Sequence, residues 1–398
     1  MSMDSSANSV LVIGGSAAGL TTAEALRRKK FTGEITVLGD EMHAPYDRPP
    51  LSKQVLAGAW QPERAALRTE ELLAGLDVRF ELGQTATSLD VSANAVHTAS
   101  GRTFSADALV IATGVRPRTL PDQPDLTGVH VLRTLEDSVR LRGDLTDGAR
   151  LVVVGEGVLG SEIAATARSL GVDVTIAGPL AAPMAGQVGP LVSGLLGDLH
   201  LRNGVHLRLG TGVAGLTGTD GRVSGVELAS GETLPADVVV VAIGAVPCTQ
   251  WLEGSGLELD NGVVCDSHCR AAEGIYAVGD VARWYHEHTG ALMRLENRTN
   301  VTEQAAAVAG VITGDSAPYA PIPYFWTDQF DAKLQVHGVL PKDADVDIVE
   351  GDVAGRRFVA RYRSNGVVTG ILGWNMPKQS RMRRQEIVDA LTDLSPSR

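Results

Sequence analysis

Two short apolar runs in this chain are each followed by a glycine-rich turn and then by a helical pattern of apolar positions. Val10–Ile13 precedes the turn Gly14-Gly-Ser-Ala-Ala-Gly19, and Leu151–Val154 precedes the turn Gly155-Glu-Gly-Val-Leu-Gly160. The apolar runs predict buried parallel strands. The helical patterns that follow them cover residues 17–28 and 159–170. In this context the turn amides and the helix dipole hold a pyrophosphate, so two copies indicate two bound dinucleotides that exchange electrons.

Further apolar and β-like segments predict additional strands and a separate C-terminal region. Before residue 320 these strands cover residues 35–38, 78–80, 95–97, 108–114, 206–209, 223–228 and 238–244. After residue 320 the composition becomes aromatic and β-like, with strands expected at 324–328, 346–349, 357–362 and 367–372 and a final helix at about 383–391. The fold class is therefore predicted to be α/β, with two Rossmann-like dinucleotide-binding domains and a C-terminal α+β domain.

The domain boundaries follow from a repeated strand ending. Ala-Thr-Gly114 closes one predicted strand, and Ala-Ile-Gly244 closes another. This recurrence suggests that the second dinucleotide domain is inserted into the first and that the chain then re-enters the first. We expect a discontinuous first domain at 1–114 and 236–322, a second domain at 115–235 and a third at 323–398.

Composition and charge exclude several classes of protein. The chain has 398 residues, 44% of them apolar, and no apolar stretch approaches the roughly 20 residues that span a membrane. The polar start, Met1–Ser9, lacks the pattern of a signal peptide. A net charge of −12 argues against nucleic-acid binding. We therefore expect a cytoplasmic protein without a membrane or nucleic-acid partner.

The cysteines and histidines do not predict a metal site. Cys248, Cys265 and Cys269 are too few for a disulfide framework and suit a reducing compartment. Cys265-Asp-Ser-His-Cys269 resembles a metal clip, but no second pair of ligands completes it. His286 and His288 have no acidic or thiol ligands nearby in the sequence and are expected in a surface loop.

The two predicted dinucleotide sites differ in whether an acidic residue follows the second strand of the domain. Asp40 and Glu41 follow the strand 35–38, about 20 residues beyond the first turn, where this fold binds a ribose hydroxyl. In the second domain no charged residue lies between Asp173 and Asp198. Neither an acid for a ribose hydroxyl nor an arginine for a 2′-phosphate is visible there, which leaves the choice of dinucleotide at the second turn open.

Several motifs occur together in the order found in one enzyme family. They are Tyr46–Lys53, Ala112–Gly114, Leu132–Asp137, Gly155–Gly160 with Glu162, Ile275–Asp280 and Phe325–Gln329. With these motifs nearly the whole chain resembles the FAD-dependent ferredoxin reductases of oxygenase systems, the putidaredoxin reductase and rubredoxin reductase group. The resemblance implies a glutathione reductase-like architecture, in which the first domain binds FAD and the second binds NADH, with NADPH possible.

The resemblance also implies which residues contact the cofactors. The cofactor-binding set would be Gly14, Ser16, Ala17, Ala18, Gly19, Asp40, Glu41, Arg48, Lys53, Ala86, Ala112, Thr113, Gly114, Arg133, Gly155, Gly157, Leu159, Gly160, Glu162, Gly244, Gly279, Asp280, Asn297 and Arg298. The catalytic residues would be Lys53, beside the flavin ring, and Glu162, near the nicotinamide. A cation at the first place stabilises the negative charge of reduced flavin. Glu162 is expected to pair with Lys53 when NAD(P)H docks.

Four more positions receive individual roles from the resemblance. Ala86 would contact the adenine by its backbone, Arg133 would reach FAD from the interdomain segment, and Asp280 would bind the ribityl chain. A carboxylate beside Gly279 at a helix N-terminus is also a plain N-cap, and Asp280 can fill both roles at once. Arg298 occupies a place where relatives commonly carry an aromatic residue, so it would either stack on the flavin or turn to solvent.

The route of the electrons out of the flavin is inferred from the missing thiols. Disulfide reductases of this architecture need a cysteine in the first domain, but none precedes Cys248. A one-electron iron–sulfur carrier is then the natural acceptor, unless a later cysteine approaches the flavin. An acidic ferredoxin would dock near Lys378, Arg381, Arg383 and Arg384, with Arg64 and Arg68 as a possible extension. The same segment could be an ordinary solvated helix start.

The sequence therefore predicts an NAD(P)H:ferredoxin reductase. It would transfer hydride from nicotinamide to FAD and single electrons to a ferredoxin that serves a monooxygenase or dioxygenase. A rubredoxin reductase, a peroxide-forming NADH oxidase and a signalling flavoprotein resembling apoptosis-inducing factor are the alternatives. A monomer or a dimer is compatible with the sequence.

Overall fold

The computed structural model describes residues 7–394, so most of the polar start lies outside the described part. The chain forms two compact units. The first consists of Met1–Asp47, Ala66–Arg116 and Val246–Pro321, and the second of Arg48–Ala65, Pro117–Ala245 and Ile322–Arg398. The chain leaves the first unit through strand β8 (Val115–Pro117) and returns through β17 (Ala245–Pro247).

The first unit is built on a six-stranded sheet, whose strands follow the order β19-β20-β7-β1-β2-β3. Their bounds are β1 (Ser9–Ile13), β2 (Glu34–Leu38), β3 (Arg79–Glu81), β7 (Ala108–Ile111), β19 (Arg270–Ala272) and β20 (Ile275–Ala277). All of them except β19 run parallel to their neighbours. The β-branched and leucine side chains of β1 and β7 are buried on both faces, as continuous apolar runs in a parallel sheet require.

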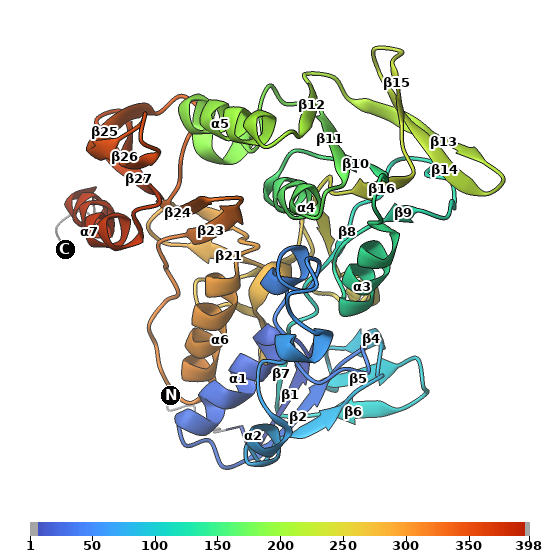
Figure 1. Cartoon of the computed structure of the whole chain (residues 1–398). Coiled ribbons are helices and arrows are strands. Elements are labelled where there is room, and N and C mark those ends of the chain that lie inside the picture. The colour runs from blue at the N-terminus through green and yellow to red at the C-terminus, as the bar shows by residue number, and fades with distance from the viewer. Residues whose placement is uncertain (1–6, 395–398) are drawn as a thin grey trace. The chain divides into compact units, whose positions relative to one another are not determined.

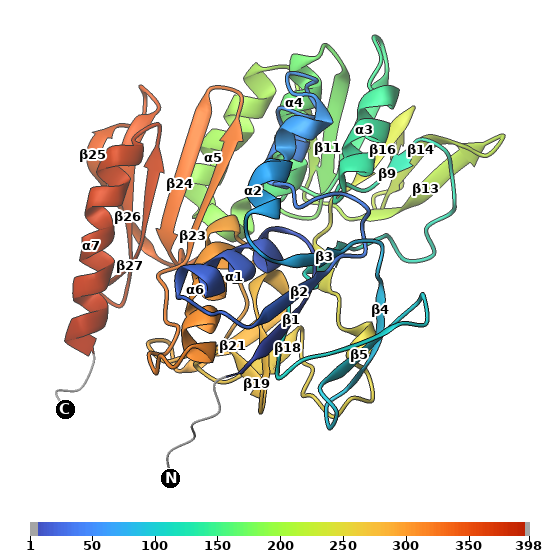
Figure 2. The same ribbon diagram turned by 90° about the horizontal axis from the view of Figure 1, so that it is seen from below.

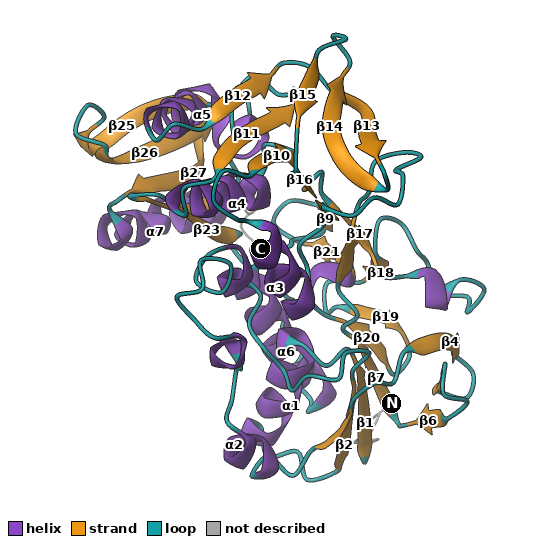
Figure 3. Cartoon of the chain, turned by 45° about the vertical axis from the view of Figure 1, so that its right-hand side comes forward, coloured by secondary structure: helices purple, strands orange, loops and turns teal. Residues whose placement is uncertain are grey.

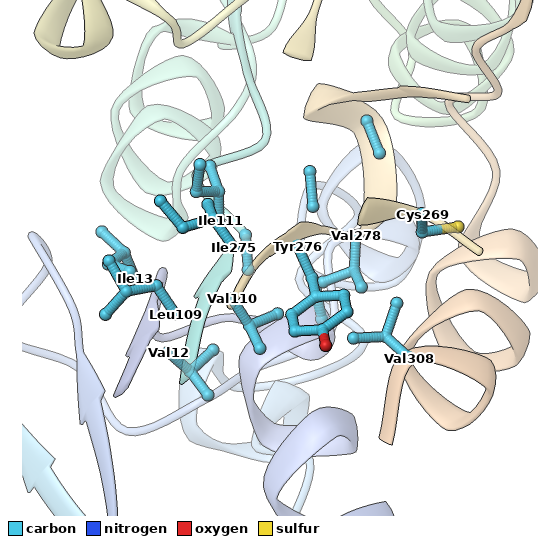
Figure 4. Packing of buried hydrophobic residues seen from close by; sticks show 14 of the residues in the cluster. Val12, Ile13, Leu109, Val110, Ile111, Cys269, Ile275, Tyr276, Val278 and Val308 are labelled. Carbon is cyan, nitrogen blue, oxygen red and sulfur yellow. The ribbon is translucent and has the colours of Figure 1, made fainter. Parts of the chain in front are cut away.

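Helices α1 (Ala17–Arg28) and α6 (Arg298–Ile312) lie side by side in this unit (Figures 1 and 2). The close-up in Figure 4 shows Val12 of β1, Val110 of β7, Tyr276 of β20 and Val308 of α6 within one buried cluster. Burial of these side chains fixes the carboxyl ends of the strands, from which the first glycine turn projects.

Shorter elements complete the first unit. They are β4 (Ala86–Asp90), β5 (Ala95–Thr98) and β6 (Thr103–Ser105), β18 (Val263–Cys265), β21 (Ala282–His286) and β22 (Ala291–Met293), helix α2 (Glu70–Ala74), and the 3₁₀ turns η3 (Gln250–Leu252) and η4 (Gly279–Val281). The first three strands form one small sheet and the next three form another.

The second unit contains a parallel sheet of its own, with the strand order β12-β11-β10-β16-β9. Figure 3 shows these strands in orange together with the small antiparallel sheet β13-β14-β15. The bounds are β9 (Val129–His130), β10 (Arg150–Val154), β11 (Asp173–Gly178), β12 (His206–Leu209), β13 (Val213–Thr219), β14 (Arg222–Leu228), β15 (Thr233–Pro235) and β16 (Val238–Val241). The helices are α3 (Leu135–Asp144), α4 (Val158–Ser169) and α5 (Ala185–Arg202), with 3₁₀ turns η1 (Pro49–Ser52) and η2 (Pro62–Ala65).

Strand β16 corrects one part of the expected domain division. The sequence analysis assigned residues 236–322 to the first domain, but β16 pairs with β10 in the second sheet. The repeated ending Ala-Ile-Gly244 has a different origin from the one we expected. β16 pairs with β10 as β7 pairs with β1, so each sheet has its own copy of this strand. The other boundaries stay predictions.

The C-terminal part of the second unit is an antiparallel sheet, with the strand order β23-β24-β27-β26-β25. Its bounds are β23 (Tyr324–Gln329), β24 (Ala332–Gly338), β25 (Asp345–Asp352), β26 (Arg357–Ser364) and β27 (Val367–Trp374). Helix α7 (Pro377–Leu394) packs along this sheet through Ile387 (Figures 1 and 2). It begins earlier than residue 383, because Pro377 suits the first helical position and the basic residues that follow favour helix. The predicted fold class, with two Rossmann-like sheets and a C-terminal α+β part, is confirmed.

Candidate functional site

The first glycine turn is closed by contacts that leave no room for side chains. Gly14 has φ +131°, and a Cβ built there would lie 2.1 Å from the carbonyl oxygen of Ala112. A Cβ on Gly19 would lie 2.0 Å from the carbonyl oxygen of Gly14. Ser16 is the N-cap of α1 but makes no hydrogen bond to the helix with its side chain. The helix N-terminus therefore keeps amide groups available for an anion such as a pyrophosphate, which the residues present fit.

The second turn repeats this geometry at the N-terminus of α4. Gly155 has φ +112°, and a Cβ there would lie 2.3 Å from the carbonyl oxygen of Ala242. A Cβ on Gly160 would lie 2.0 Å from the carbonyl oxygen of Gly155. The N-cap Gly157 has no side chain to cap the helix, and Leu159 is partly exposed on its first turn. Each unit thus carries one turn shaped for a dinucleotide.

Several predicted flavin-binding residues gather around the first turn. A Cβ on Gly279 would lie 3.4 Å from the Cβ of Ala18, so the turn η4 lies against the start of α1. Asp40 lies just beyond the end of β2 and is exposed. Glu41 accepts a hydrogen bond from the Tyr46 hydroxyl at 2.5 Å. Of these two acids, Asp40 is therefore the more accessible to a ligand.

Other predicted residues of the first unit make local contacts of their own. The Thr113 hydroxyl donates to the carbonyl oxygen of Cys248 at 2.9 Å, and the amide of Cys248 donates to the carbonyl of Gly114. Asp280 accepts from Arg294 at its backbone oxygen. Ala86 begins β4 in a separate small sheet, where it pairs with Thr98.

Arg298 at the start of α6 is held by an ion pair. Its Nε lies 2.6 Å from Oδ1 of Asp47, and its Nη1 donates to the Thr302 hydroxyl. Asn297 is the N-cap residue of the same helix. The guanidinium is therefore fixed within the first unit by a residue of the proline-rich loop, a partner that the sequence analysis did not name.

Lys53 and Glu162 meet within the second unit. The ammonium nitrogen of Lys53 lies 2.5 Å from Oε2 of Glu162, and both side chains are largely buried. The Ser52 hydroxyl donates to the same oxygen at 2.6 Å. The Thr327 hydroxyl of β23 donates to Oε1 at 2.9 Å. The pair that was expected to form on docking of NAD(P)H is therefore already formed.

A chain of buried polar groups extends from this carboxylate. Gln329 donates to the Thr327 hydroxyl at 3.2 Å and contacts the sulfur of Met184. The oxygen of its amide lies 2.9 Å from Nε2 of His200 in α5. Burial lowers the pKa of His200, so this histidine is neutral at physiological pH. The motif Phe325–Gln329 signalled part of this network, but no local pattern pointed to His200.

The remaining predicted residues of the second unit are tied to backbone groups. Nη1 of Arg48 donates to the carbonyl oxygen of Arg133 at 2.5 Å. The amides of Arg133 and Thr134 both donate to Asp137, and the bond from Thr134 completes a capping box at the start of α3. Gly244 follows β16 with φ +97°.

Glu156, inside the second turn, is a residue that the sequence analysis did not consider as a ligand. Its side chain is buried, with 4% exposed. Its Oε1 accepts a hydrogen bond from the amide of Leu180 at 2.6 Å. Its Oε2 lies 1.7 Å from the position that a Cβ on Gly178 would take. The carboxylate therefore occupies the carboxyl end of β11.

The basic segment of α7 is partly free. Lys378, Arg381 and Arg384 are exposed, whereas Arg383 contacts Glu386 at 2.8 Å. The two cations expected to extend the segment have local partners: Arg64 lies over the Trp60 ring, and Arg68 lies 2.6 Å from Glu24.

The cysteines are not paired with one another. Cys265 and Cys269 are buried, and burial raises the pKa of the Cys269 thiol to about 12. All three cysteines lie in the described part of the chain, and none forms a disulfide. Within residues 7–394 no group of three or more His, Cys, Asp or Glu side chains could hold a metal ion. None of the helices in that range is long and apolar enough to cross a bilayer.

Comparison with known proteins gives matches over nearly the whole chain. Residues 8–306 match the pyridine nucleotide-disulphide oxidoreductase family, and residues 324–397 match the reductase C-terminal family. Rhodocoxin reductase of Rhodococcus erythropolis is 36% identical over 390 residues, which are 98% of this chain and 91% of the relative. The ferredoxin reductase component of chlorobenzene dioxygenase from Cupriavidus sp. (strain PS12) is 38% identical over 98% of this chain and 95% of its own.

A solved structure also matches nearly the whole chain. The covalent complex of putidaredoxin reductase with putidaredoxin contains a chain that matches with a TM-score of 0.92 and 33% identity. The match covers 96% of this chain and 93% of that chain.

Proposed function

The chain belongs to the pyridine nucleotide-disulphide oxidoreductase family, and from this premise we propose that it is an FAD-dependent NADH:ferredoxin reductase. The observation that supports the proposal best is the presence of two uncapped glycine turns, each at the carboxyl edge of its own parallel sheet. One dinucleotide per turn provides a donor and an acceptor of electrons on one protein.

The first turn would hold FAD. The amides at Gly14–Gly19 would bind the pyrophosphate, and the exposed carboxylate of Asp40 would accept the adenosine ribose hydroxyl. When bound, FAD supplies the capacity to take up two electrons together and release them one at a time. Asp280, beside Gly279 in η4, would bind the ribityl chain.

Charged residues of the chain would tune the flavin. The guanidinium of Arg298 is oriented by Asp47. A cation near the flavin, such as this guanidinium of the first unit, would stabilise the reduced, negatively charged form, because charge is screened little where water is excluded.

The second turn would hold NADH. The amides at Gly155–Gly160 would bind its pyrophosphate, and Glu162, one turn into α4, would lie toward the nicotinamide. Glu162 accepts hydrogen bonds at both carboxylate oxygens, so its position is fixed before a nucleotide binds. A fixed carboxylate orients a ligand without the entropic cost of ordering a mobile side chain.

We propose an acidic iron–sulfur ferredoxin as the electron acceptor. One relative is named as the ferredoxin reductase component of a dioxygenase, and another was solved in covalent complex with putidaredoxin. The exposed cations Lys378, Arg381 and Arg384 of α7 are close in sequence to the exposed Met382 and offer a positive surface on an acidic protein. Local positive charge steers an acidic partner even when the net charge is negative. A cytoplasmic location, where NADH and reduced thiols coexist, is part of this proposal.

Stopped-flow reduction of the FAD-loaded protein tests the proposed function. NADH is mixed with the protein, and an acidic [2Fe–2S] ferredoxin with cytochrome c as reporter is then added. We expect rapid bleaching of the flavin and reduction of cytochrome c that depends on ferredoxin. Bleaching without transfer to the ferredoxin would favour an oxidase or a signalling flavoprotein. No bleaching with NADH or NADPH would mean that the second turn is not a nicotinamide site.

A further inference from the structure

The first dinucleotide turn provides an internal reference for the second. In the first unit Ile13 pairs with Leu38, and the amide of Gly14 donates to the carbonyl of Leu38 at 2.8 Å. The next residues after β2 are Gly39 and the exposed Asp40. This acid lies at the strand end, where the fold binds the ribose of its dinucleotide.

The second unit has the same register but lacks that acid. Val154 pairs with Ala177, and the amide of Gly155 donates to the carbonyl of Ala177 at 2.8 Å. Gly178 therefore corresponds to the glycine at the end of β2. Pro179 then occupies the place of the acid. A proline cannot bind a ribose hydroxyl through its side chain.

Glu156 brings a carboxylate to this place from the neighbouring turn. It corresponds to Gly15, whose Cβ position lies 3.0 Å from the Cα of Gly39. At the second site the Glu156 side chain lies against Gly178, so closely that a Cβ on Gly178 would overlap Oε2. The missing side chain at Gly178 is what allows the carboxylate to reach the end of β11.

The carboxylate is only partly satisfied. Oε1 of Glu156 accepts from the Leu180 amide at 2.6 Å, whereas Oε2 accepts no hydrogen bond from residues 7–394. The residue is buried, with 4% of its surface exposed. This second oxygen keeps some exposure to solvent, so a ligand or water can donate a hydrogen bond to it. No cation neutralises it from the segment between Asp173 and Asp198, which carries no charged residue.

We propose that Glu156 selects NADH over NADPH, accepting the 2′-hydroxyl of the adenosine ribose with the oxygen that has no donor. This inference rests on the proposed binding of a nicotinamide nucleotide at the second turn. A 2′-phosphate would meet the negative charge of Glu156 and would find no arginine in the segment after β11. In the first unit the acid for the ribose is Asp40, at the end of the strand. In the second unit the corresponding acid is Glu156, within the glycine turn.

Binding of nucleotide fragments tests the inference independently of electron transfer. Calorimetry on the FAD-loaded full chain would compare ADP-ribose with 2′-phospho-ADP-ribose, for the wild type and for Glu156→Gln. Glutamine keeps an oxygen for the Leu180 amide, so the fold should persist, as thermal melting and the flavin spectrum would show. In Glu156→Gln we expect the affinity for ADP-ribose to fall about 10-fold or more. The ratio of the affinity for ADP-ribose to that for 2′-phospho-ADP-ribose should fall at least as much. Asp173→Asn, at the opposite end of β11, is the control for loss of one charge and should leave the preference unchanged.

A double variant that relocates the acid provides a second test of the inference. In Glu156→Ala/Gly178→Glu the carboxylate returns to the end of β11, and the alanine leaves room for it. Recovery of the preference for ADP-ribose, relative to Glu156→Ala alone, supports the inference. A Glu156→Gln protein that keeps the wild-type preference overturns it while leaving the proposed function intact. A wild-type protein that binds neither fragment overturns both.

Discussion

Nζ of Lys53 and Oε2 of Glu162 lie 2.5 Å apart although 109 positions separate the two residues in the chain. The carboxylate is also held by Ser52 and by Thr327, so neither charge depends on solvent. Buried pairs are retained only where further hydrogen bonds offset the loss of hydration, and these hydroxyl groups provide them. The arrangement presents a lysine and a glutamate in fixed positions.

Removal of the carboxylate charge should separate catalysis from cofactor retention. In Glu162→Gln we expect the rate of flavin reduction by NADH to fall about 10-fold or more, while the content of FAD stays near one per chain. The free energy of unfolding should fall by about 1–3 kcal/mol, because Lys53 loses its buried partner. Stopped-flow absorbance and thermal melting measure the two effects. Glu34→Gln, an exposed acid at the start of β2, is the charge control. Equal losses of FAD and of rate would contradict the role of Glu162.

Matched glycine substitutions should assign the two turns. Gly14→Ala places a Cβ 2.1 Å from a backbone oxygen, and Gly155→Ala places one at 2.3 Å. Both positions also need positive φ, so each substitution should distort its own turn by several kcal/mol. We expect Gly14→Ala to be purified without FAD, and Gly155→Ala to keep FAD but resist reduction by NADH.

The flavin absorbance of each purified variant and its change on mixing with NADH test this assignment. Gly143→Ala in α3, where nothing lies within 4 Å of the added Cβ, should behave as wild type or melt slightly higher. Normal reduction of the Gly155→Ala protein by NADH would argue against nicotinamide binding at the second turn.

Charge reversal on α7 should weaken transfer to an acidic ferredoxin. Arg381→Glu and Arg384→Glu replace exposed cations. We expect each to lower kcat/KM for ferredoxin about 5- to 10-fold at low salt, with the difference from wild type shrinking as salt rises, because steering between charges is screened. Reduction of the flavin by NADH should not change. Arg28→Glu, an exposed position on α1, is the control. An effect that persists unchanged at high salt would point away from electrostatic docking.

His337 should make the C-terminal sheet sensitive to acid. Burial, then the nearby Arg384 and Arg381, lower the pKa of His337 to about 4. The histidine titrates near its usual pKa of about 6.5 in the unfolded chain. The folded state therefore takes up its proton later than the unfolded state as pH falls. The stabilisation is complete above about pH 6.5 and is lost as pH falls toward 4.

The His337→Phe variant tests this dependence. Phenylalanine can keep the stacking on Tyr324, whose ring centroid lies 4.7 Å from that of His337. We expect its free energy of unfolding, measured by thermal melting, to fall less than that of the wild type between pH 6.5 and 4, by an amount on the order of 1 kcal/mol. Parallel pH profiles for the two proteins would contradict the assignment.

Local patterns predicted most of the framework. The apolar runs Val10–Ile13 and Leu151–Val154 and the helix at 17–28 needed only the periodicity of neighbouring residues. The partner of a strand is a different matter. Val238–Val241 has the same apolar character as the strands of either sheet, and only its pairing with β10 assigns it to the second. No local property of the run carries that information.

The features of the candidate site also fall into those that local sequence predicted and those that tertiary contacts decided. By itself the sequence determined the two dinucleotide turns, because glycine at fixed spacing is a local steric requirement that no other residue meets. It also placed Lys53 and Glu162 in recognisable motifs. Only the tertiary structure decided that Thr327 and Ser52 hold the Glu162 carboxylate, and that Glu156 extends to the end of β11 over Gly178. These contacts join segments that are distant in the chain, and packing rather than spacing along the sequence determines which of them meet.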